Sequence, residues 1–260
     1  MYPILSLFGF SFGTYGICCV IGGAFAIWLA IRNGKRFQQD QFAMLEACVW
    51  ALIGGFLGAK LLYLLVSFSD IVEMFQTSGF NWNTISSLLE GGFVFYGGLL
   101  GGLAALLLYL HHFQLPYGVY LSSITPAVPL AHACGRIGCF FAGCCYGRET
   151  DSWFSITFTH SDFAPNGVKL LPTQLMSSAG DFLICGLLLL YAGRKPKEGQ
   201  VAAGYMVLYG IGRFIIEFFR NDYRGSIGVL STSQIISIGV VAAGVVFYLV
   251  MNRRERSVGN

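Results

Sequence analysis

Charged residues are scarce in this sequence. They make up 11% of its 260 residues, whereas soluble domains carry about 25%. Hydrophobic residues reach 55%, so the composition excludes an ordinary soluble domain and indicates an integral membrane protein. The formal net charge of +3 is too small to indicate a nucleic-acid-binding protein, and no nucleic-acid partner is expected.

Several other common signals are absent. The residues before Tyr15 lack the basic n-region of a cleavable signal peptide, so the apolar run that follows is expected to be retained. The sequence shows no internal repeat and no low-complexity tract. We therefore expect one integral-membrane domain over residues 1–260.

The cysteines do not follow a common metal-binding or disulfide pattern. Four lie in apolar runs, where a thiol usually packs as a small hydrophobic group: Cys18, Cys19, Cys48 and Cys185. The other four lie close together, but without the C-x-x-C spacing or the histidine pair of zinc and iron–sulfur sites: Cys134, Cys139, Cys144 and Cys145. We expect no metal and no cofactor. Packing thiols, a disulfide, and a metal or catalytic thiol remain open interpretations of this second group.

Long apolar runs are the main positive feature. A membrane-spanning helix needs about 20 apolar residues, and seven runs reach or approach that length: residues 14–31, 42–66, 92–112, 118–141, 173–193, 199–219 and 229–251. The sequence therefore predicts an all-α polytopic membrane protein with seven transmembrane helices.

The loops between these runs alternate in charge. Basic residues follow the first, fifth and seventh runs: Arg32, Lys35 and Arg36; Arg194, Lys195 and Lys197; Arg253, Arg254 and Arg256. The loops on the other side hold few: Arg148, Lys169, Arg220 and Arg224. Because cytoplasmic loops are enriched in Lys and Arg, this pattern predicts an N-terminus outside and a C-terminus in the cytoplasm.

Two segments on the outer side are expected to form small caps. Residues 67–90 mix acidic and aromatic side chains, which predicts short amphipathic helices at the interface. The second segment is residues 142–172, where the alternation in Trp153–Phe158 predicts a small strand or cap. Within the runs, closely spaced glycines such as Gly54, Gly58 and Gly101 predict tight helix packing.

A few charged groups interrupt the apolar runs. Arg213 and Glu217 are four residues apart and are predicted to pair on one helix face, with Arg220 near the same face. Arg136 and Lys60 add cations that one carboxylate cannot neutralise. Because buried cations are costly, this surplus predicts an anionic ligand such as a phosphatidyl headgroup. The lone His132 is interpreted as a packing residue.

Motifs follow one another in a set order along the whole chain: Tyr15-Gly16, Gly58–Tyr63, Gly91–Leu99, Gly135-Arg136-Ile137-Gly138, Tyr146-Gly147-Arg148, Pro172-Thr173-Gln174-Leu175, and Tyr209–Arg220 with Gln234 beyond it. In order and spacing they resemble the motifs of the prolipoprotein diacylglyceryl transferase family of bacterial inner membranes. The resemblance implies transfer of the diacylglyceryl group of phosphatidylglycerol to the lipobox cysteine of a prolipoprotein, with a thioether and glycerol 1-phosphate as products.

The same resemblance assigns roles to individual residues. It implies catalytic roles for Arg136, Arg213, Glu217 and Tyr96. It implies substrate-binding roles for Tyr15, Lys60, Gly97, Gly98, Cys139, Gly147, Arg148, Arg220 and Gln234. The implied partners are phosphatidylglycerol, a prolipoprotein signal peptide or another thiol acceptor, and the lipid bilayer. We expect a monomer in the bacterial plasma (inner) membrane, crossing it several times.

The sequence departs from the family pattern at several positions. Cys139 replaces a family asparagine, and Ala142 and Cys144 replace later polar positions. Tyr96 stands where a histidine is usual, and Lys60 where an arginine is usual. The residues expected to bind the lipid donor are better retained than the others. A related transferase with a different acceptor, a membrane thiol-redox or metal protein, and a non-catalytic lipid-binding protein are therefore alternative interpretations.

Overall fold

The computed structural model describes residues 4–7, 10–161, 163–194, 196–221, 226–227 and 230–258, most of them helical. Lys195 and Arg224, counted above among the loop charges, lie outside the described residues. The chain divides into two compact units, Met1–Gln39 with Gly118–Asn260, and Asp40–Tyr117. The expectation of one domain over residues 1–260 stays a prediction.

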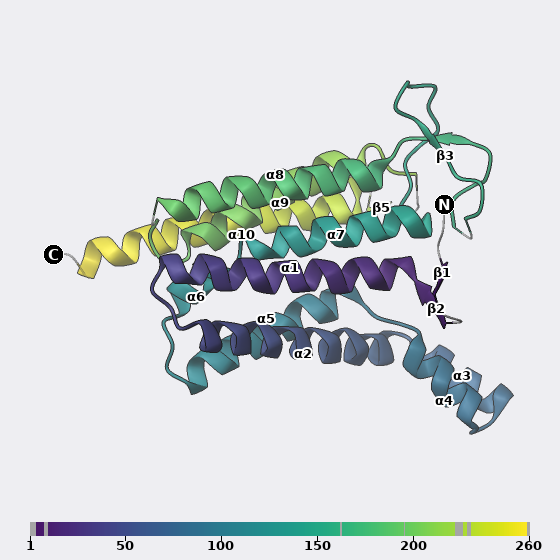
Figure 1. Cartoon of the computed structure of the whole chain (residues 1–260), viewed down its shortest axis with the longest axis horizontal. Coiled ribbons are helices and arrows are strands. Elements are labelled where there is room, and N and C mark those ends of the chain that lie inside the picture. The colour runs from purple at the N-terminus through teal and green to yellow at the C-terminus, as the bar shows by residue number, and fades with distance from the viewer. Residues whose placement is uncertain are drawn as a thin grey trace. The chain divides into compact units, whose positions relative to one another are not determined.

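The first unit is a row of packed helices (Figure 1). Its helices are α1 (Thr14–Arg36), α6 (Tyr117–Ile124), α7 (Ala127–Ala142), α8 (Thr173–Gly193), α9 (Gln200–Glu217) and α10 (Thr232–Val258). Helix α7 packs against α1 and α8, α8 packs against α9, and α9 packs against α10. Buried side chains at the α8–α9 contact include Leu188 and Val201. This packing brings α7, α8 and α9 together, and they carry most of the charged groups predicted for a site.

Short strands lie outside the helices of this unit. Strands β1 (Ile4–Leu7) and β2 (Phe10–Gly13) form an antiparallel pair before α1 that was not expected from the sequence. Strand β3 (Ile156–Thr157) pairs with β4 (Lys169–Leu170) over a small core of Phe158, Ala164 and Leu170. This pair confirms the strand predicted in Trp153–Phe158. Strands β5 (Ser226–Ile227) and β6 (Leu230–Ser231) pair just before α10.

The second unit is built on a glycine-lined helix pair, α2 (Gln41–Val66) and α5 (Phe95–His112). A Cβ atom on Gly58 would meet the carbonyl oxygen of Gly97, and one on Gly54 would meet Gly101 O at 2.6 Å. The two backbones therefore touch, which only glycine permits at this distance. The tight packing predicted from the glycine spacing is confirmed.

Two short helices connect this pair, α3 (Phe68–Ser78) and α4 (Trp82–Glu90). Helix α4 begins at an N-cap residue, Asn81, whose side chain accepts a hydrogen bond from the backbone N–H of Thr84 at 2.9 Å. Short helices within residues 67–90 are thus confirmed, and their place at the membrane interface stays a prediction.

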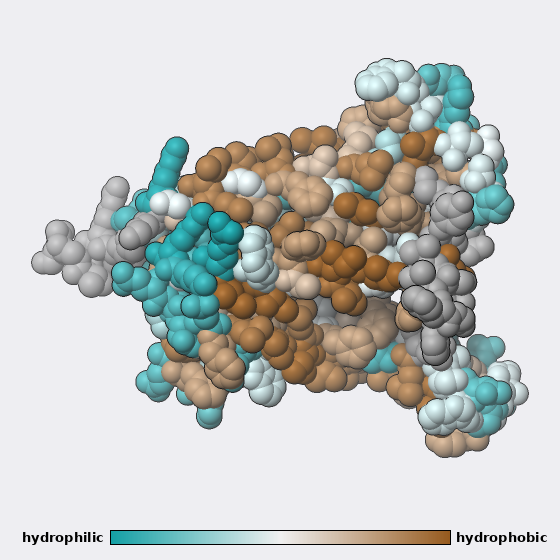
Figure 2. All heavy atoms as spheres, viewed as in Figure 1, coloured by the Kyte–Doolittle hydropathy of each residue, from teal (hydrophilic) through white to brown (hydrophobic). Residues whose placement is uncertain are grey.

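Five helices among the described residues are long and apolar enough to cross a membrane: α1, α2, α5, α8 and the part of α10 over Thr232–Arg253. Large apolar side chains on them are exposed, such as Phe56, Leu183 and Leu190. Figure 2 shows hydrophobic surface over the helices of the first unit and hydrophilic side chains over its β3–β4 segment. A surface of this kind suits lipid rather than water, and the chain is a multi-pass membrane protein.

The span predicted over residues 118–141 needs a correction, because the structure divides it into α6 and α7. Pro126 has no backbone N–H, and its ring would clash with the carbonyl group of Ser122 in a continuous helix. Instead Thr125 Oγ1 donates to Leu121 O at 2.6 Å, and Val128 N donates to Thr125 O at 3.1 Å. Ser122, Ser123 and Thr125 precede Pro126, but the hydropathy averaged over residues 118–141 did not show the break.

Candidate functional site

A cavity of about 250 Å³ lies in the first unit, bounded by α7, α8 and α9. Its walls combine charged and polar side chains with an apolar majority. The polar part of the lining is Arg136, Ser177, Asp181, Tyr209 and Arg213, and the apolar part includes Met176, Ile184, Ile215, Ile216 and Phe219. A mostly apolar cavity with a few convergent charges fits a ligand that has both a charged and an apolar part.

The best-defined charged contact at this cavity is the ion pair of Arg213 and Glu217. Arg213 Nη2 lies 2.7 Å from Glu217 Oε2, and the two side chains are 13% and 8% exposed. Arg213 also donates to Ser233 Oγ at 2.9 Å, and Ser231 Oγ donates to Glu217 Oε1 at 3.0 Å. The predicted pairing on one helix face is confirmed.

The guanidinium groups of Arg136 and Arg220 lie close enough to Arg213 to interact with it electrostatically. Arg136, half-buried on α7, interacts electrostatically with Arg213, Arg220 and Asp181. Three guanidinium groups thus stand against the two carboxylates of Glu217 and Asp181. The excess of positive charge favours an anion, and the forked donors of arginine match the geometry of a phosphate group.

The loop that follows α7 is tied to the ends of α8 and α9. Gly147 N donates to Leu171 O at 3.1 Å, and Arg148 N donates to Phe219 O at 3.0 Å. A Cβ atom on Gly147 would lie 2.7 Å from both Leu171 and Thr173, so no other residue fits there. The guanidinium of Arg148 is exposed and lies 5.9 Å from the ring centre of Phe219, which lines the cavity.

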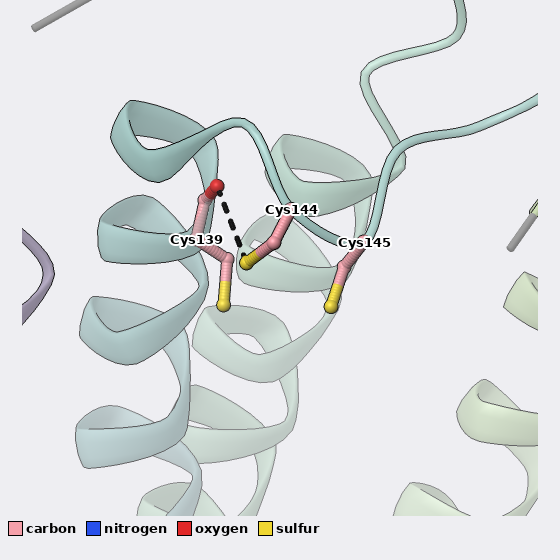
Figure 3. A group of neighbouring side chains, drawn as sticks. All are labelled: Cys139, Cys144 and Cys145. Carbon is pink, nitrogen blue, oxygen red and sulfur yellow. Dashed lines mark hydrogen bonds between the residues drawn. The ribbon is translucent and has the colours of Figure 1, made fainter. Parts of the chain in front are cut away.

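Three thiols converge at this loop, as Figure 3 shows. The Sγ atoms of Cys139, Cys144 and Cys145 all lie within 4.8 Å of one another. The structure contains no disulfide among the eight cysteines, all of which lie in its described part. Hydrogen bonds from the Cys139 and Cys144 thiols, followed by the Arg220 guanidinium, hold the pKa of the Cys145 thiol below its ordinary value. The sequence spacing did not predict this cluster.

Tyr15 and Gln234 are also placed in the first unit. Tyr15 is 49% exposed at the start of α1 and lies against Gly138 of α7, where a Cβ atom would be 3.1 Å from its ring. Tyr15 also interacts electrostatically with Cys139 and Cys144. Gln234 Oε1 accepts from Ser231 N at 3.0 Å, and Gln234 N donates to Ser231 Oγ at 3.2 Å. This reciprocal pair is a capping box for α10.

The remaining predicted site residues lie in the second unit. Lys60 Nζ donates to Leu88 O and, at 2.6 Å, to Gly91 O, and it lies 4.9 Å from the ring centre of Phe93. Lys60 is therefore satisfied by its own unit, and it does not need the anionic ligand that the sequence suggested. Gly97 and Gly98 contact the α2 backbone, and Tyr96 is 46% exposed on α5.

Several residues at the site were not predicted. Asp181 and Tyr209 line the cavity, and the only available signals were a single acid in an apolar run and a tyrosine inside the Tyr209–Arg220 motif. Gln174 Nε2 donates to Cys144 O at 2.8 Å, and Thr173 Oγ1 donates to Cys145 O at 2.9 Å. These bonds join residues about 30 positions apart, so only the folded chain reveals them.

The chain is similar to known proteins over nearly its whole length. A model of the prolipoprotein diacylglyceryl transferase family matches residues 3–250. The phosphatidylglycerol–prolipoprotein diacylglyceryl transferase of Clostridium tetani is 37% identical over 257 residues, which cover 98% of this chain and 100% of the relative. An enzyme of that name with the suffix 2, from Clostridium perfringens, is 38% identical over 96% of this chain and 95% of its own length. The enzyme from Finegoldia magna is 32% identical over 94% of this chain and 93% of its own length.

Proposed function

The chain belongs to the prolipoprotein diacylglyceryl transferase family, and from this premise we propose that it transfers the diacylglyceryl group of phosphatidylglycerol to the lipobox cysteine of a prolipoprotein and releases glycerol 1-phosphate. The observation that supports this most is the cavity between α7, α8 and α9. It combines an apolar lining with the guanidinium groups of Arg136 and Arg213, as an anionic lipid requires.

The reaction is a displacement at a glycerol carbon. The acceptor sulfur forms a bond to that carbon, and the bond from the carbon to a phosphate oxygen breaks with its electron pair on the oxygen. The thiol proton leaves to a base. The phosphate group gains a second negative charge as it departs, so the step is accelerated by donors held where that charge develops.

Arg136 and Arg213 line the cavity and are assigned to this charge, with Arg220 beside them. Glu217 holds Arg213 at 2.7 Å and so fixes the direction of its donors. Asp181 lines the same cavity. Tyr15, Cys139 at the end of α7, and Gly147 and Arg148 in the loop that follows are assigned to the acceptor side of the site. Tyr96 in the second unit is a further proposed site residue.

The arrangement of the first unit supports an orientation in the membrane. Tyr15, at the N-terminal end of α1, lies against Gly138 of α7, which directly precedes Cys139 near the C-terminal end of α7. Basic residues Lys35, Arg36 and Arg194 lie at the opposite ends of α1 and α8. Because basic ends favour the cytoplasm, the N-terminus lies outside, the C-terminus inside, and the site in the outer half of the bilayer. We also propose that the chain is a monomer with a single domain, and that it crosses the bacterial inner membrane seven times.

A reconstituted assay tests this function. The full-length protein in detergent is mixed with phosphatidylglycerol and a peptide that carries a lipobox cysteine, and products are identified by mass spectrometry. We expect a thioether-linked diacylglyceryl peptide and an equal amount of glycerol phosphate. A peptide with serine in place of the cysteine, and phosphatidylcholine in place of phosphatidylglycerol, are the matched controls and should give no product. Absence of the thioether with phosphatidylglycerol refutes the proposed function.

A further inference from the structure

The three-thiol cluster at the end of α7 has the dimensions of a metal site. Its Sγ atoms lie within 4.8 Å of one another, and the side chains converge on one space in Figure 3. Zinc–sulfur bonds of about 2.3 Å in a tetrahedral arrangement place sulfur atoms about 3.8 Å apart. Small side-chain rotations therefore suffice to bring the three sulfurs onto one ion.

The backbone around the cluster is held in an uncommon shape. Gly143 and Cys145 both have left-handed conformations, with φ of 77° and 60°. Glycine adopts such a φ readily, but Cys145 does so at a cost of about 1 kcal/mol or more. Gln174 and Thr173 donate to the carbonyl groups of Cys144 and Cys145, and Gln174 and Thr173 are both only 1% exposed. These bonds turn the two cysteines back toward Cys139 and fix the cluster in place.

The charges next to the cluster suit thiolates. Arg136 interacts electrostatically with Cys139 and Cys145, and Arg220 interacts with Cys145. Three thiolates on one divalent ion carry a net charge of −1, and a fourth thiolate makes it −2. The guanidinium groups of Arg136 and Arg220 offset part of that charge, which favours thiolates at the cluster.

We propose that Cys139, Cys144 and Cys145 bind one zinc ion through their three thiolates, and that the fourth position of the ion takes the acceptor thiol of the transfer reaction. Three protein ligands with one open position are the usual arrangement of a catalytic zinc site, whereas iron–sulfur clusters need four ligands. The spacing of the cysteines in the sequence argued against a metal, whereas the convergence of the three Sγ atoms in the fold favours one. The second part of this inference rests on the proposed function.

The zinc site supplies the nucleophile that the transfer needs. On binding zinc the acceptor thiol loses its proton to solvent, because a coordinating thiol is deprotonated. The bound thiolate attacks the glycerol carbon, the carbon–oxygen bond breaks, and the electron pair leaves with the phosphate. Zinc keeps its oxidation state throughout, and the thioether product is a weaker ligand that a new thiol displaces. Arg136, one turn before Cys139 on α7, lines the donor cavity, so nucleophile and donor lie side by side.

Metal content tests the first part. The full-length protein is purified under reducing conditions with zinc in the medium, dialysed, and analysed by elemental mass spectrometry. We expect about one zinc ion per chain, and a loss of about ten-fold or more in the variant with Cys139→Ser, Cys144→Ser and Cys145→Ser. Cys134→Ser is the matched control, because Cys134 is half-buried on the same helix but outside the cluster, and it should keep its zinc. A wild-type protein without zinc overturns the proposal.

Cobalt(II) in place of zinc tests the fourth position and does not depend on turnover or on the folding of a variant. The wild-type protein loaded with cobalt should show the visible absorption of tetrahedral cobalt with sulfur ligands. Addition of a lipobox peptide with cysteine should strengthen the sulfur-to-cobalt charge-transfer band, whereas the serine peptide should leave it unchanged. An unchanged spectrum with both peptides overturns the assignment of the acceptor to the metal.

Transfer assays on the same samples separate the two proposals. If the zinc-free triple variant is folded and transfers diacylglyceryl at the wild-type rate, the role of zinc in activating the acceptor is refuted and the transferase function stands. If the zinc-loaded wild-type protein makes no thioether, the proposed function is refuted, while the metal content and the cobalt spectrum still decide whether the site exists. If mass spectrometry detects a disulfide between two cysteines of the cluster in protein purified under reducing conditions, that result counts against the zinc site.

Discussion

Replacing both members of the Arg213–Glu217 pair by methionine separates a role in catalysis from a role in stability. The two side chains are 13% and 8% exposed and their charged atoms are 2.7 Å apart, so the pair is largely removed from solvent. Arg213→Met alone leaves the Glu217 carboxylate buried without its cation, although it still accepts a hydrogen bond from the Ser231 hydroxyl, and we expect a loss of about 3 to 5 kcal/mol in unfolding free energy. The double variant removes both charges, and such replacements are often neutral or stabilising by about 1 to 4 kcal/mol.

The double variant should keep its stability but lose its activity. If Arg213 stabilises the departing phosphate, the double variant lacks that donor and should lose about 100- to 1000-fold in kcat, although it unfolds at or above the wild-type temperature. Thermal unfolding in detergent and diacylglyceryl transfer to a lipobox peptide are measured on the same preparations. A double variant that is as stable and as active as the wild type would show that the pair only holds α9 in place, and would refute the assignment of Arg213 to the phosphate.

Three further changes test other parts of the structure. Arg136→Ala should lower kcat by about 100-fold or more with little change in unfolding temperature. Arg136→Lys should recover only part of the lost kcat, since an ammonium group cannot form the paired bonds of a guanidinium. Equal activity of the wild type and both variants would contradict the role of Arg136. Gly101→Ala should destabilise the α2–α5 pair by about 1 to 3 kcal/mol, because its Cβ atom would lie 2.9 Å from Gly58 Cα. Gly23→Ala, whose Cβ atom has no neighbour within 4 Å, is the control and should be neutral or stabilising. Gln234→Ala should cost about 1 kcal/mol by removing half of the α10 capping box, whereas a rise in KM with no change in unfolding temperature would assign Gln234 to the substrate instead.

The apolar helices and the tight packing at glycines were predictable from the sequence. An apolar run extends over many residues, so a small error at its ends does not change the prediction of a helix. The glycine spacing did not indicate which helices pair, and the contacts of Gly54 with Gly101 and of Gly58 with Gly97 appear only in the structure. Pro126 was visible in the sequence, but the end of α6 was missed because residues 118–141 were interpreted as one span from their average hydropathy. Hydropathy indicates whether a segment prefers lipid or water, and it does not indicate which residue ends a helix.

The candidate site was only partly predictable, for a related reason. The Arg213–Glu217 pair is local, so helix geometry alone predicts it. The partners of Lys60 are backbone carbonyl groups near residues 88–91, and no side-chain pattern records them. The cysteine cluster depends on left-handed backbone at Gly143 and Cys145 and on bonds from α8. Spacing rules assume a regular backbone between ligands, and this loop is not regular.

The fate of one oxygen atom tests the central claim most directly. Phosphatidylglycerol is prepared with a heavy-oxygen label on the atom that bridges the diacylglyceryl carbon and phosphorus, and is incubated with the protein and a lipobox peptide. Displacement at carbon, with the phosphate held by Arg136 and Arg213, predicts that all of the label appears in glycerol phosphate and none in the lipidated peptide. Label recovered in diacylglycerol would mean that the phosphorus–oxygen bond had broken, and would contradict the account.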